Sequence, residues 1–281
     1  MPSKRQPGIG IVAFAIFLLS TAGASAQSLV GVLGMGQEAA PFEKKLQDSR
    51  EVVVQGYVFH VGRLDGRPVV LGRSGPGKVN AAIVATLMIN HFSPSVLFFS
   101  GTAGAIDPAL RPGDVVIGET VAQHDVGTQT PSGITRRGPR NALTGEFDPI
   151  LIHAPESLLV TARRSAAGLT LPTVKTQDGD HVPRIVEGVI VTGDVFMSDS
   201  NRREELRTNL GAAAVEMEGG AFIQTCRQFN VPCLVVRSVT DRADTQALNN
   251  YQQFVGLASE NAAALVTAII DRLSSASDNV R

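Results

Sequence analysis

The chain has 281 residues, with 25 lysines and arginines against 26 aspartates and glutamates, and its formal net charge at pH 7 is −1. This balance argues against a nucleic acid or an anionic membrane as partner, so we expect a small molecule instead. The length suffices for one α/β domain with a well-buried core.

The first 26 residues have the pattern of a signal peptide. Lys4 and Arg5 precede an apolar stretch over residues 9–19, and the small residues Ala24 and Ala26 follow as an A-x-A cleavage site. The apolar stretch is shorter than the roughly 20 residues that span a bilayer, which favours cleavage over a retained anchor. We therefore expect a processed domain over residues 27–281 that is periplasmic or secreted, without stable membrane association. No later segment looks long and apolar enough to cross a membrane.

Short apolar runs alternate with longer amphipathic ones, which is typical of α/β proteins. The polar stretch over residues 125–146 predicts a long loop, a candidate lid, and Asp65-Gly66 predicts a hairpin turn. The expected strands cover residues 29–33, 52–61, 68–71, 95–99, 114–121, 188–193, 213–216 and 232–239. The expected helices cover residues 38–48, 79–92, 155–167, 202–206, 218–229 and 251–273.

The two cysteines, Cys226 and Cys233, fall on an expected helix and on the strand that follows it. An oxidising compartment would allow a disulfide, but two cysteines make no framework, so we favour two buried thiols. No cluster of cysteine and histidine has metal-ligand spacing, and we expect neither a metal nor a cofactor.

Five polar segments follow buried strands, and ligands of α/β folds bind at the carboxyl ends of strands. Taken singly, each has a plain structural explanation, such as an acid in a first helical turn, a tight turn or a capping carboxylate. The glycine-rich segment could also cradle an anion, although it lacks the spacing of a P-loop. The segments are Gly34–Glu38, Ser74–Asn80, Ser100–Ala105, Ala214–Gly220 and Ser238–Asp244.

Together and in this order, the segments resemble the purine nucleoside phosphorylase/nucleosidase superfamily, and within it the methylthioadenosine/adenosylhomocysteine nucleosidase branch. The resemblance covers nearly all of the processed chain. It rests on the blocks Ser74-Gly-x-Gly-Lys-Val79, Gly101-Thr-Ala-Gly104, Thr192-Gly-Asp-x-Phe196, Val215-Glu-Met-Glu218 and Ser238-x-x-Asp-x-Ala-Asp244.

The resemblance implies a fold, an activity and an assembly. The fold would be a single-domain three-layer αβα sandwich with a central mixed sheet. The activity would be hydrolysis of the N-glycosidic bond of an adenine nucleoside, which releases adenine and a ribose or thioribose. The assembly would be a homodimer in which the neighbouring subunit lines part of the pocket for the 5′ group.

The resemblance also implies roles for single residues. Asp241 would protonate N7 of the adenine, and Glu38 would activate the attacking water. Glu218 would accept the ribose hydroxyls, with Met217 beneath the sugar. The other expected substrate contacts are Phe196, which would stack on the purine, Met197, which would read the base edge through its backbone, and Thr102, Ala103, Gly104, Glu216, Thr240 and Tyr251.

These roles make chemical sense for a purine that would otherwise leave as an anion. General acid catalysis at the base contributes about 10²–10⁴-fold to the rate. Asp241 must then hold a proton through a raised pKa, whereas Glu38 must stay ionised to accept one from water.

Two alternatives remain. A phosphorylase would need basic partners for its phosphate, yet Leu97-Phe-Phe-Ser100 and the loop with Glu38 have no arginine where phosphorylases that resemble this chain place them. Arg136, Arg137 and Arg140 in the long loop could bind phosphate or merely solubilise the loop, and we favour the second. The other alternative is a non-catalytic periplasmic protein that binds purine nucleosides.

Overall fold

The computed structural model describes residues 28–131, 133–176 and 179–273, and the signal peptide expected from the sequence lies outside these ranges. The strands are β1 (Val30–Met35), β2 (Gln47–Val54), β3 (Tyr57–Leu64), β4 (Arg67–Ser74), β5 (Val96–Ala105), β6 (Val115–Gln123), β7 (Gly127–Thr130), β8 (Gly133–Arg136), β9 (Ile152–His153), β10 (Ile185–Thr192), β11 (Ala212–Glu216) and β12 (Cys233–Asp241). The helices are the 3-10 turn η1 (Gly36–Ala39), α1 (Ala40–Lys45), α2 (Lys78–Phe92), α3 (Glu156–Ala167), α4 (Ser200–Leu210), α5 (Gly219–Gln228) and α6 (Ala247–Arg272).

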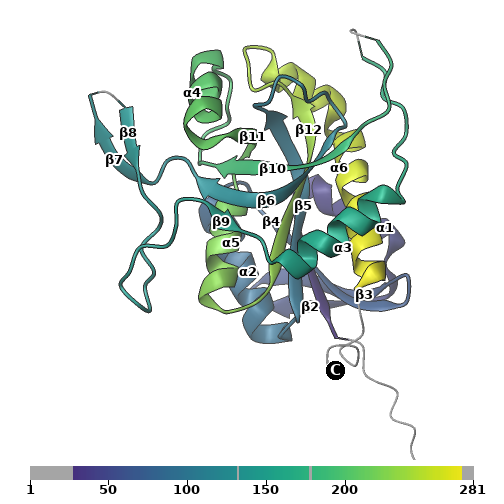
Figure 1. Cartoon of the computed structure of the whole chain (residues 1–281). Coiled ribbons are helices and arrows are strands. Elements are labelled where there is room, and N and C mark those ends of the chain that lie inside the picture. The colour runs from purple at the N-terminus through teal and green to yellow at the C-terminus, as the bar shows by residue number, and fades with distance from the viewer. Residues whose placement is uncertain (1–27, 132, 177–178, 274–281) are drawn as a thin grey trace, which may run out of the picture.

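One mixed sheet organises the molecule (Figure 1), in the strand order β11-β10-β6-β12-β5-β1-β4-β3-β2, with β9 beside β6. Strands β4, β1, β5 and β12 run parallel to one another, so their carboxyl ends share one edge. Strand β11 pairs with its parallel neighbour β10 and, antiparallel over its last residues, with the end of β5. The carboxyl end of β11 therefore also reaches the edge where β5 ends.

Helices cover both faces of this sheet. Successive residues of β12 alternate between two cores: Val235 packs in the cluster that holds α2 and α5, whereas Leu234 and Val236 pack in the cluster that holds α3 and α6. A strand covered on both faces needs apolar residues at every position, which explains its continuous apolar run. The single-domain three-layer αβα sandwich with a central mixed sheet is confirmed.

The expected single strand over residues 52–61 is wrong. The chain reverses at Gln55 and Gly56, whose φ angles are 50° and 86°, and Val54 lies opposite Tyr57 in the antiparallel pair β2–β3. Both arms are rich in β-branched and aromatic residues, and Gln-Gly is a weaker hairpin signal than Asn-Gly or Asp-Gly. The hairpin turn at Asp65-Gly66 is confirmed, since it joins β3 to β4 with φ angles of 47° and 82°.

Two other segments differ from their expected structure. The helix expected over residues 38–48 ends at Lys45, because the chain enters edge strand β2 at Gln47. The long loop over residues 125–146 contains the β7–β8 hairpin, which projects from the body of the molecule (Figure 1).

The expectation of two free thiols is also wrong. Cys226 in α5 and Cys233 at the start of β12 form a disulfide, with their Cα atoms 6.2 Å apart. The pattern of the sequence could not reveal this, because the pairing depends on how the α5–β12 connection brings the two Cβ atoms together.

One later segment does meet the length and hydropathy of a membrane span, contrary to the sequence expectation. In the described part of the chain this is α6, and 61% of its most apolar 18-residue window is buried. The helix is apolar because it packs along the sheet, with Ala262, Leu265, Val266 and Ile269 in the core that it shares with α3.

Candidate active site

The carboxyl ends of five strands surround one cavity. Strand β1 leads directly into the η1 turn with Glu38, β5 carries Thr102 to Gly104, and β12 ends at Asp241. In the register of β5 and β12, Ser238 pairs with Thr102 and Asp241 with Gly104 across a β-bulge. Strands β10 and β11 deliver the segments with Phe196 and Glu218 to the opposite wall.

The cavity has a volume of about 330 Å³. All twelve residues predicted as site residues line it: Glu38, Thr102, Ala103, Gly104, Phe196, Met197, Glu216, Met217, Glu218, Thr240, Asp241 and Tyr251. Met35, Pro76, Val195, Val215 and Leu248 complete its mostly apolar wall. The two expected catalytic carboxyl groups, of Glu38 and Asp241, thus open into the same cavity.

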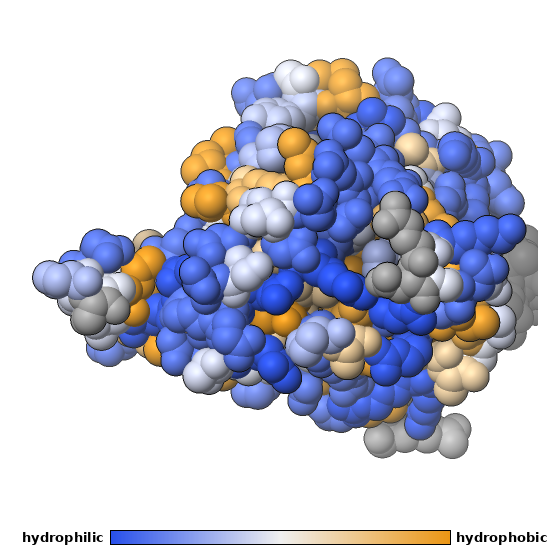
Figure 2. Space-filling view, turned by 90° about the horizontal axis from the view of Figure 1, so that it is seen from above, coloured by the Kyte–Doolittle hydropathy of each residue, from blue (hydrophilic) through white to orange (hydrophobic). Residues whose placement is uncertain are grey.

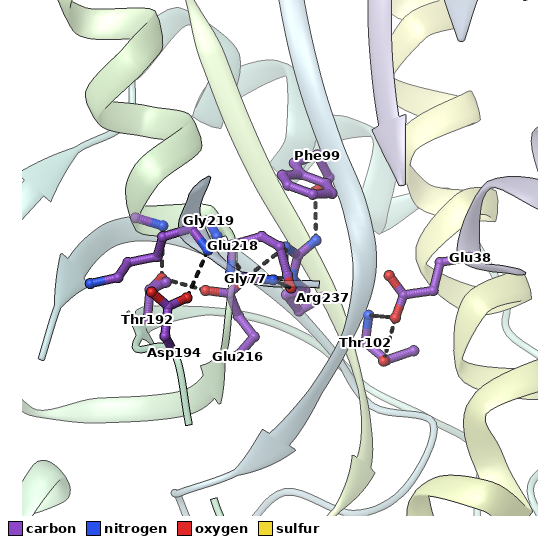
Figure 3. A network of polar contacts seen from close by, with 12 residues as sticks. Glu38, Gly77, Phe99, Thr102, Thr192, Asp194, Glu216, Glu218, Gly219 and Arg237 are labelled. Atoms are coloured by element: carbon purple, nitrogen blue, oxygen red, sulfur yellow. Dashed lines mark hydrogen bonds and ion pairs between the residues drawn. The ribbon is translucent and has the colours of Figure 1, made fainter. Parts of the chain in front are cut away.

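Glu38 is buried, with 3% of its surface exposed. Its Oε1 accepts hydrogen bonds from the Thr102 backbone N–H at 3.1 Å and from the Thr102 hydroxyl at 2.6 Å. Figure 3 shows this pair set apart from the other carboxyl groups. Burial raises the pKa of Glu38, while the charge of Arg237 and the Thr102 donors act in the opposite direction.

Asp241 is equally buried but has weaker support for a negative charge. Burial raises its pKa, and Asp244 adds to the rise, against hydrogen bonds from Thr240 and Ala243. Its Oδ2 lies 2.8 Å from the Thr240 hydroxyl, which also lies 3.3 Å from the Ala103 carbonyl oxygen. One hydroxyl has one proton to donate. The Thr240 hydroxyl proton is therefore divided between Asp241 and the Ala103 carbonyl oxygen, which weakens its support for an ionised Asp241.

Two glycines of the Gly101-Thr-Ala-Gly104 block make room for these carboxyl groups. A Cβ atom on Gly101 would lie 2.4 Å from Glu38 Oε2 and 2.9 Å from Arg237 Nη1. A Cβ atom on Gly104 would lie 2.8 Å from Asp241 Oδ1. The sequence led us to expect that the small residues admit a ligand to the backbone. In the structure they also allow the carboxyl groups of Glu38 and Asp241 to approach the backbone of β5.

A buried arginine supports the opposite wall (Figure 3). Arg237 Nη2 lies 2.6 Å from Glu216 Oε2 and 3.8 Å from Glu218 Oε2, and its guanidinium stacks on the Phe99 ring. Burial would lower the pKa of Arg237, but Glu216, Glu218 and Glu38 outweigh it and raise the pKa. The charge of Arg237 therefore compensates three acids at once.

The two acids around Met217 are not equivalent. Both oxygens of Glu216 are used by the protein: they accept from the Thr192 hydroxyl, from the backbone N–H groups of Glu218 and Gly219, and from Arg237. Among the residues that the structure describes, Glu218 accepts one hydrogen bond, from the Gly77 backbone N–H at 2.8 Å. Burial and the neighbouring Glu216 raise the pKa of Glu218 to about 7. Glu218 Oε2, which has no hydrogen-bond donor among the described residues, can thus accept from a ligand.

Arg237 is the functional residue that the sequence reasoning missed. It stands within the apolar run Leu234-Val-Val-Arg-Ser-Val239, four residues before Asp241. A charge inside a buried strand is almost never found without a partner, and that signal could have found it.

Aromatic and sulfur side chains form the remaining wall. Phe196 and Tyr251 meet edge to face, with ring centroids 6.1 Å apart. Phe196 is 42% exposed, whereas Met197 is buried. Burial raises the pKa of the Tyr251 hydroxyl, to which the Gln37 side chain is hydrogen bonded.

The positions of cations bear on whether phosphate could bind. Of the residues that line the cavity in the described part of the chain, none is lysine or arginine. The backbone N–H groups at the glycine-rich turn before α2 donate hydrogen bonds to carboxylates of the protein itself. The N–H of Gly77 donates to Glu218 and that of Lys78 to Asp194.

The loop arginines have structural partners instead. Arg136 pairs with Glu205 and donates to the His124 carbonyl oxygen. Arg137 stacks on Phe147, and Arg140 donates to the Gly145 carbonyl oxygen. These contacts hold the long loop together.

A three-layer αβα fold with an acid-lined cavity at the strand ends is the arrangement of nucleoside-cleaving enzymes that the sequence led us to expect. The family model described as "Phosphorylase superfamily" matches residues 28–271, and the chain belongs to this family.

Two kinds of relative refine the placement. The chain is 34% identical over 247 residues to 5′-methylthioadenosine/S-adenosylhomocysteine nucleosidase of Psychromonas ingrahamii, which covers 87% of this chain and 99% of that protein. It is similar to the solved Neisseria meningitidis nucleosidase of the same name in complex with methylthio-immucillin-A (TM-score 0.74, 29% identity, 88% of this chain and 100% of the other). It is also similar to the futalosine hydrolase of Helicobacter pylori (TM-score 0.73, 30% identity, 88% and 98%).

Proposed function

We propose that this protein hydrolyses the N-glycosidic bond of an adenine nucleoside of the methylthioadenosine/adenosylhomocysteine type and releases adenine. It is an N-glycosyl hydrolase. The observation that carries this proposal is the pair of buried acids, Glu38 in the η1 turn and Asp241 at the end of β12, which face one cavity. No lysine or arginine is found among the described residues that line this cavity.

The acid at the base end is Asp241. Its raised pKa keeps a proton available, and this proton passes to N7 as the bond between C1′ and N9 breaks and its electron pair moves into the purine. Protonation turns an anionic leaving group into neutral adenine, a contribution of about 10²–10⁴-fold. Phe196 and Met197 form the wall on which the base would lie.

Glu218 and Glu38 act at the sugar end of the substrate. Glu218 Oε2 accepts the ribose hydroxyls, and Met217 packs beneath the ring. Negative charge on this wall stabilises the oxocarbenium-like sugar. The oxygen of a water molecule then bonds to C1′, and Glu38 accepts the proton that the water loses.

The difference between the two catalytic acids comes from their partners. Burial raises both pKa values, but Glu38 has Arg237 and two Thr102 donors for its ionised form. Asp241 also accepts hydrogen bonds, from Thr240 and Ala243, but the charge that acts on it is the like charge of Asp244. These partners favour an ionised Glu38 beside a protonated Asp241, the division of labour that hydrolysis requires.

The test is base release from methylthioadenosine, adenosylhomocysteine, adenosine and inosine, each with and without inorganic phosphate. We expect adenine release that is independent of phosphate, with a free sugar as the second product. Release that requires phosphate and yields a sugar 1-phosphate would identify a phosphorylase. Tight binding of nucleoside without turnover would identify a binding protein.

We also infer that the functional unit is a homodimer. The resemblance implies it, and three exposed apolar side chains support it. They are Val195, which lines the cavity, and Val79 and Ile83 on α2, the helix that follows the cavity-lining Pro76. In analytical ultracentrifugation, Val79→Glu should shift the protein toward monomer. The equally exposed Val53→Glu on the β2–β3 hairpin should not, and dissociation by both variants or by neither would refute this interface.

Export to the periplasm or the medium is a further proposal. The pattern of residues 1–26 motivates it, and the disulfide between Cys226 and Cys233 supports it, because disulfides persist in oxidising compartments. Cell fractionation of the full-length protein should recover the processed form outside the cytoplasm. Recovery of the unprocessed chain in the cytosol would contradict the proposal.

A further inference from the structure

The loop between β10 and α4 presents Phe196 and Met197 to the cavity without regular secondary structure of its own. Phe196 is partly exposed, and its one described ring contact is with Tyr251. Met197 packs in a hydrophobic cluster with Ile106 and Val191, whereas Phe196 is less tightly packed, so polar contacts of the loop backbone contribute to its position.

Asp125, at the end of β6, provides the central contact. Its Oδ2 accepts a hydrogen bond from the Asp194 backbone N–H at 3.1 Å, and its Oδ1 lies 2.7 Å from Lys78 Nζ. The side chain of Asp194 returns to the same helix, since its Oδ1 accepts from the Lys78 backbone N–H at 2.8 Å. Three segments that are distant in sequence thus close into one ring of contacts.

The neighbouring His124 acts as a packing element under the same loop. A Cβ atom on Gly193 would lie 2.3 Å from His124 Nε2, so the imidazole ring lies directly against the loop backbone. Burial lowers the pKa of His124, and its ring nitrogens have no hydrogen-bond partner among the described residues. The imidazole ring contacts the loop by van der Waals packing. The hydrogen bond to the loop backbone comes from Asp125 instead.

The helix that receives these contacts also holds the acid expected at the ribose. The N–H of Gly77 donates to Glu218 Oε1, one residue before the N–H that donates to Asp194. The N-terminus of α2 therefore contacts both the loop that carries the expected base wall and the expected acceptor for the sugar. Figure 3 shows Gly77, Asp194 and Glu218 in the same polar network.

We propose that Asp125 is a positioning residue for purine binding, which acts through Asp194 and Lys78 to set the loop with Phe196 and Met197. The proposal rests on the proposed function, because it takes that loop as the base wall. Asp241 lies at the end of β12 and Glu38 in the η1 turn, and neither takes part in the ring of contacts. Loss of Asp125 should weaken binding of the base and leave the chemical step largely intact.

The test compares the wild type with Asp125→Ala and with the milder Asp125→Asn. Calorimetry measures the Kd of free adenine, and steady-state kinetics separate KM from kcat for methylthioadenosine. For Asp125→Ala we expect the adenine Kd and the KM to rise about tenfold, with kcat within about threefold of the wild type. Asp125→Asn should show a smaller rise in the same direction.

Asp148→Ala is the matched control. Asp148 is a buried acid paired with Arg227 at 2.8 Å and does not line the cavity. It should leave the adenine Kd and the KM unchanged even if it lowers the melting temperature. Folded Asp125 variants with a wild-type adenine Kd, or an equal loss of affinity in Asp148→Ala, would overturn the inference alone. Wild-type protein that binds no adenine would overturn the proposed function and this inference with it.

Discussion

Arg237 and Glu216 form an ion pair, with Nη2 2.6 Å from Oε2, in which both side chains are at most 2% exposed. The pair joins β12 to the end of β11, and Glu216 itself lines the cavity. Glu216 in turn holds the first N–H groups of α5. This pair connects the two strands that deliver the general acid and the expected ribose acceptor.

Replacing Arg237 by methionine should lower the free energy of unfolding by about 3–5 kcal/mol, because Glu216 would remain buried without its counter-charge. Urea denaturation at pH 7 measures the loss. Arg163→Met serves as control, since Arg163 pairs with Glu187 on the surface and exposed ion pairs contribute little to stability. A similar small loss in both variants would show that the buried pair is dispensable.

Asp241→Asn should lower turnover by about 10²-fold or more while the fold persists, because an amide has no acidic proton for the leaving base. The measurement is adenine release, with a urea titration to confirm stability. Asp148→Asn, at a buried acid that pairs with Arg227 outside the cavity lining, should retain most of the activity. Full activity in a stable Asp241→Asn protein would eliminate the general-acid mechanism.

Glu218 should make stability depend on pH. Its pKa is about 7 in the folded protein against an ordinary value of 4.5, so the folded state binds the proton more tightly than the unfolded state. The resulting stabilisation is complete below pH 4.5 and is lost as the pH rises through 7, by at most about 1.4 kcal/mol per pH unit. Glu38 and Asp241 contribute in the same direction.

Denaturation at pH 5 and pH 7.5 tests this dependence. In Glu218→Gln, the loss of stability between the two pH values should be smaller than in the wild type by about 1–3 kcal/mol. Parallel profiles for the two proteins would mean that Glu218 titrates normally.

Reduction of the Cys226–Cys233 disulfide should lower the free energy of unfolding by about 2 kcal/mol, as expected for a short closed loop. The bond lies at the start of β12 and Asp241 at the end of the same strand, so activity should survive. Urea curves and rates with and without dithiothreitol provide the measurement. A Cys226→Ala/Cys233→Ala protein should not respond to the reductant, and any response there would assign the effect to another cause.

Local sequence patterns predicted much of the fold. Continuous apolar runs such as Leu234-Val-Val236 predicted strands covered on both faces, and the spacing of apolar residues predicted the long helices. The same patterns failed where two signals of equal strength were adjacent. The β2–β3 hairpin was interpreted as one strand because strand-forming residues flank its Gln55-Gly56 turn.

The polar residues at the strand ends, together with the family resemblance, predicted the members of the site. All twelve line one cavity. Their contacts could not be predicted, because the antiparallel pairing of β11 with the end of β5 determines which acids meet Arg237. For the same reason the sequence did not distinguish the two glutamates. Both oxygens of Glu216 accept hydrogen bonds from the protein, whereas Glu218 Oε2 has no hydrogen-bond donor among the described residues.

The amino-acid sequence by itself determined the fold class, the family and the residues that gather at the strand ends, because periodicity and motif order are local properties of the chain. Only the tertiary structure decided the disulfide, the partners of Arg237 and the raised pKa values of the acids. These depend on distances between segments far apart in sequence and on burial, and both arise only when the sheet has closed and the helices have covered it.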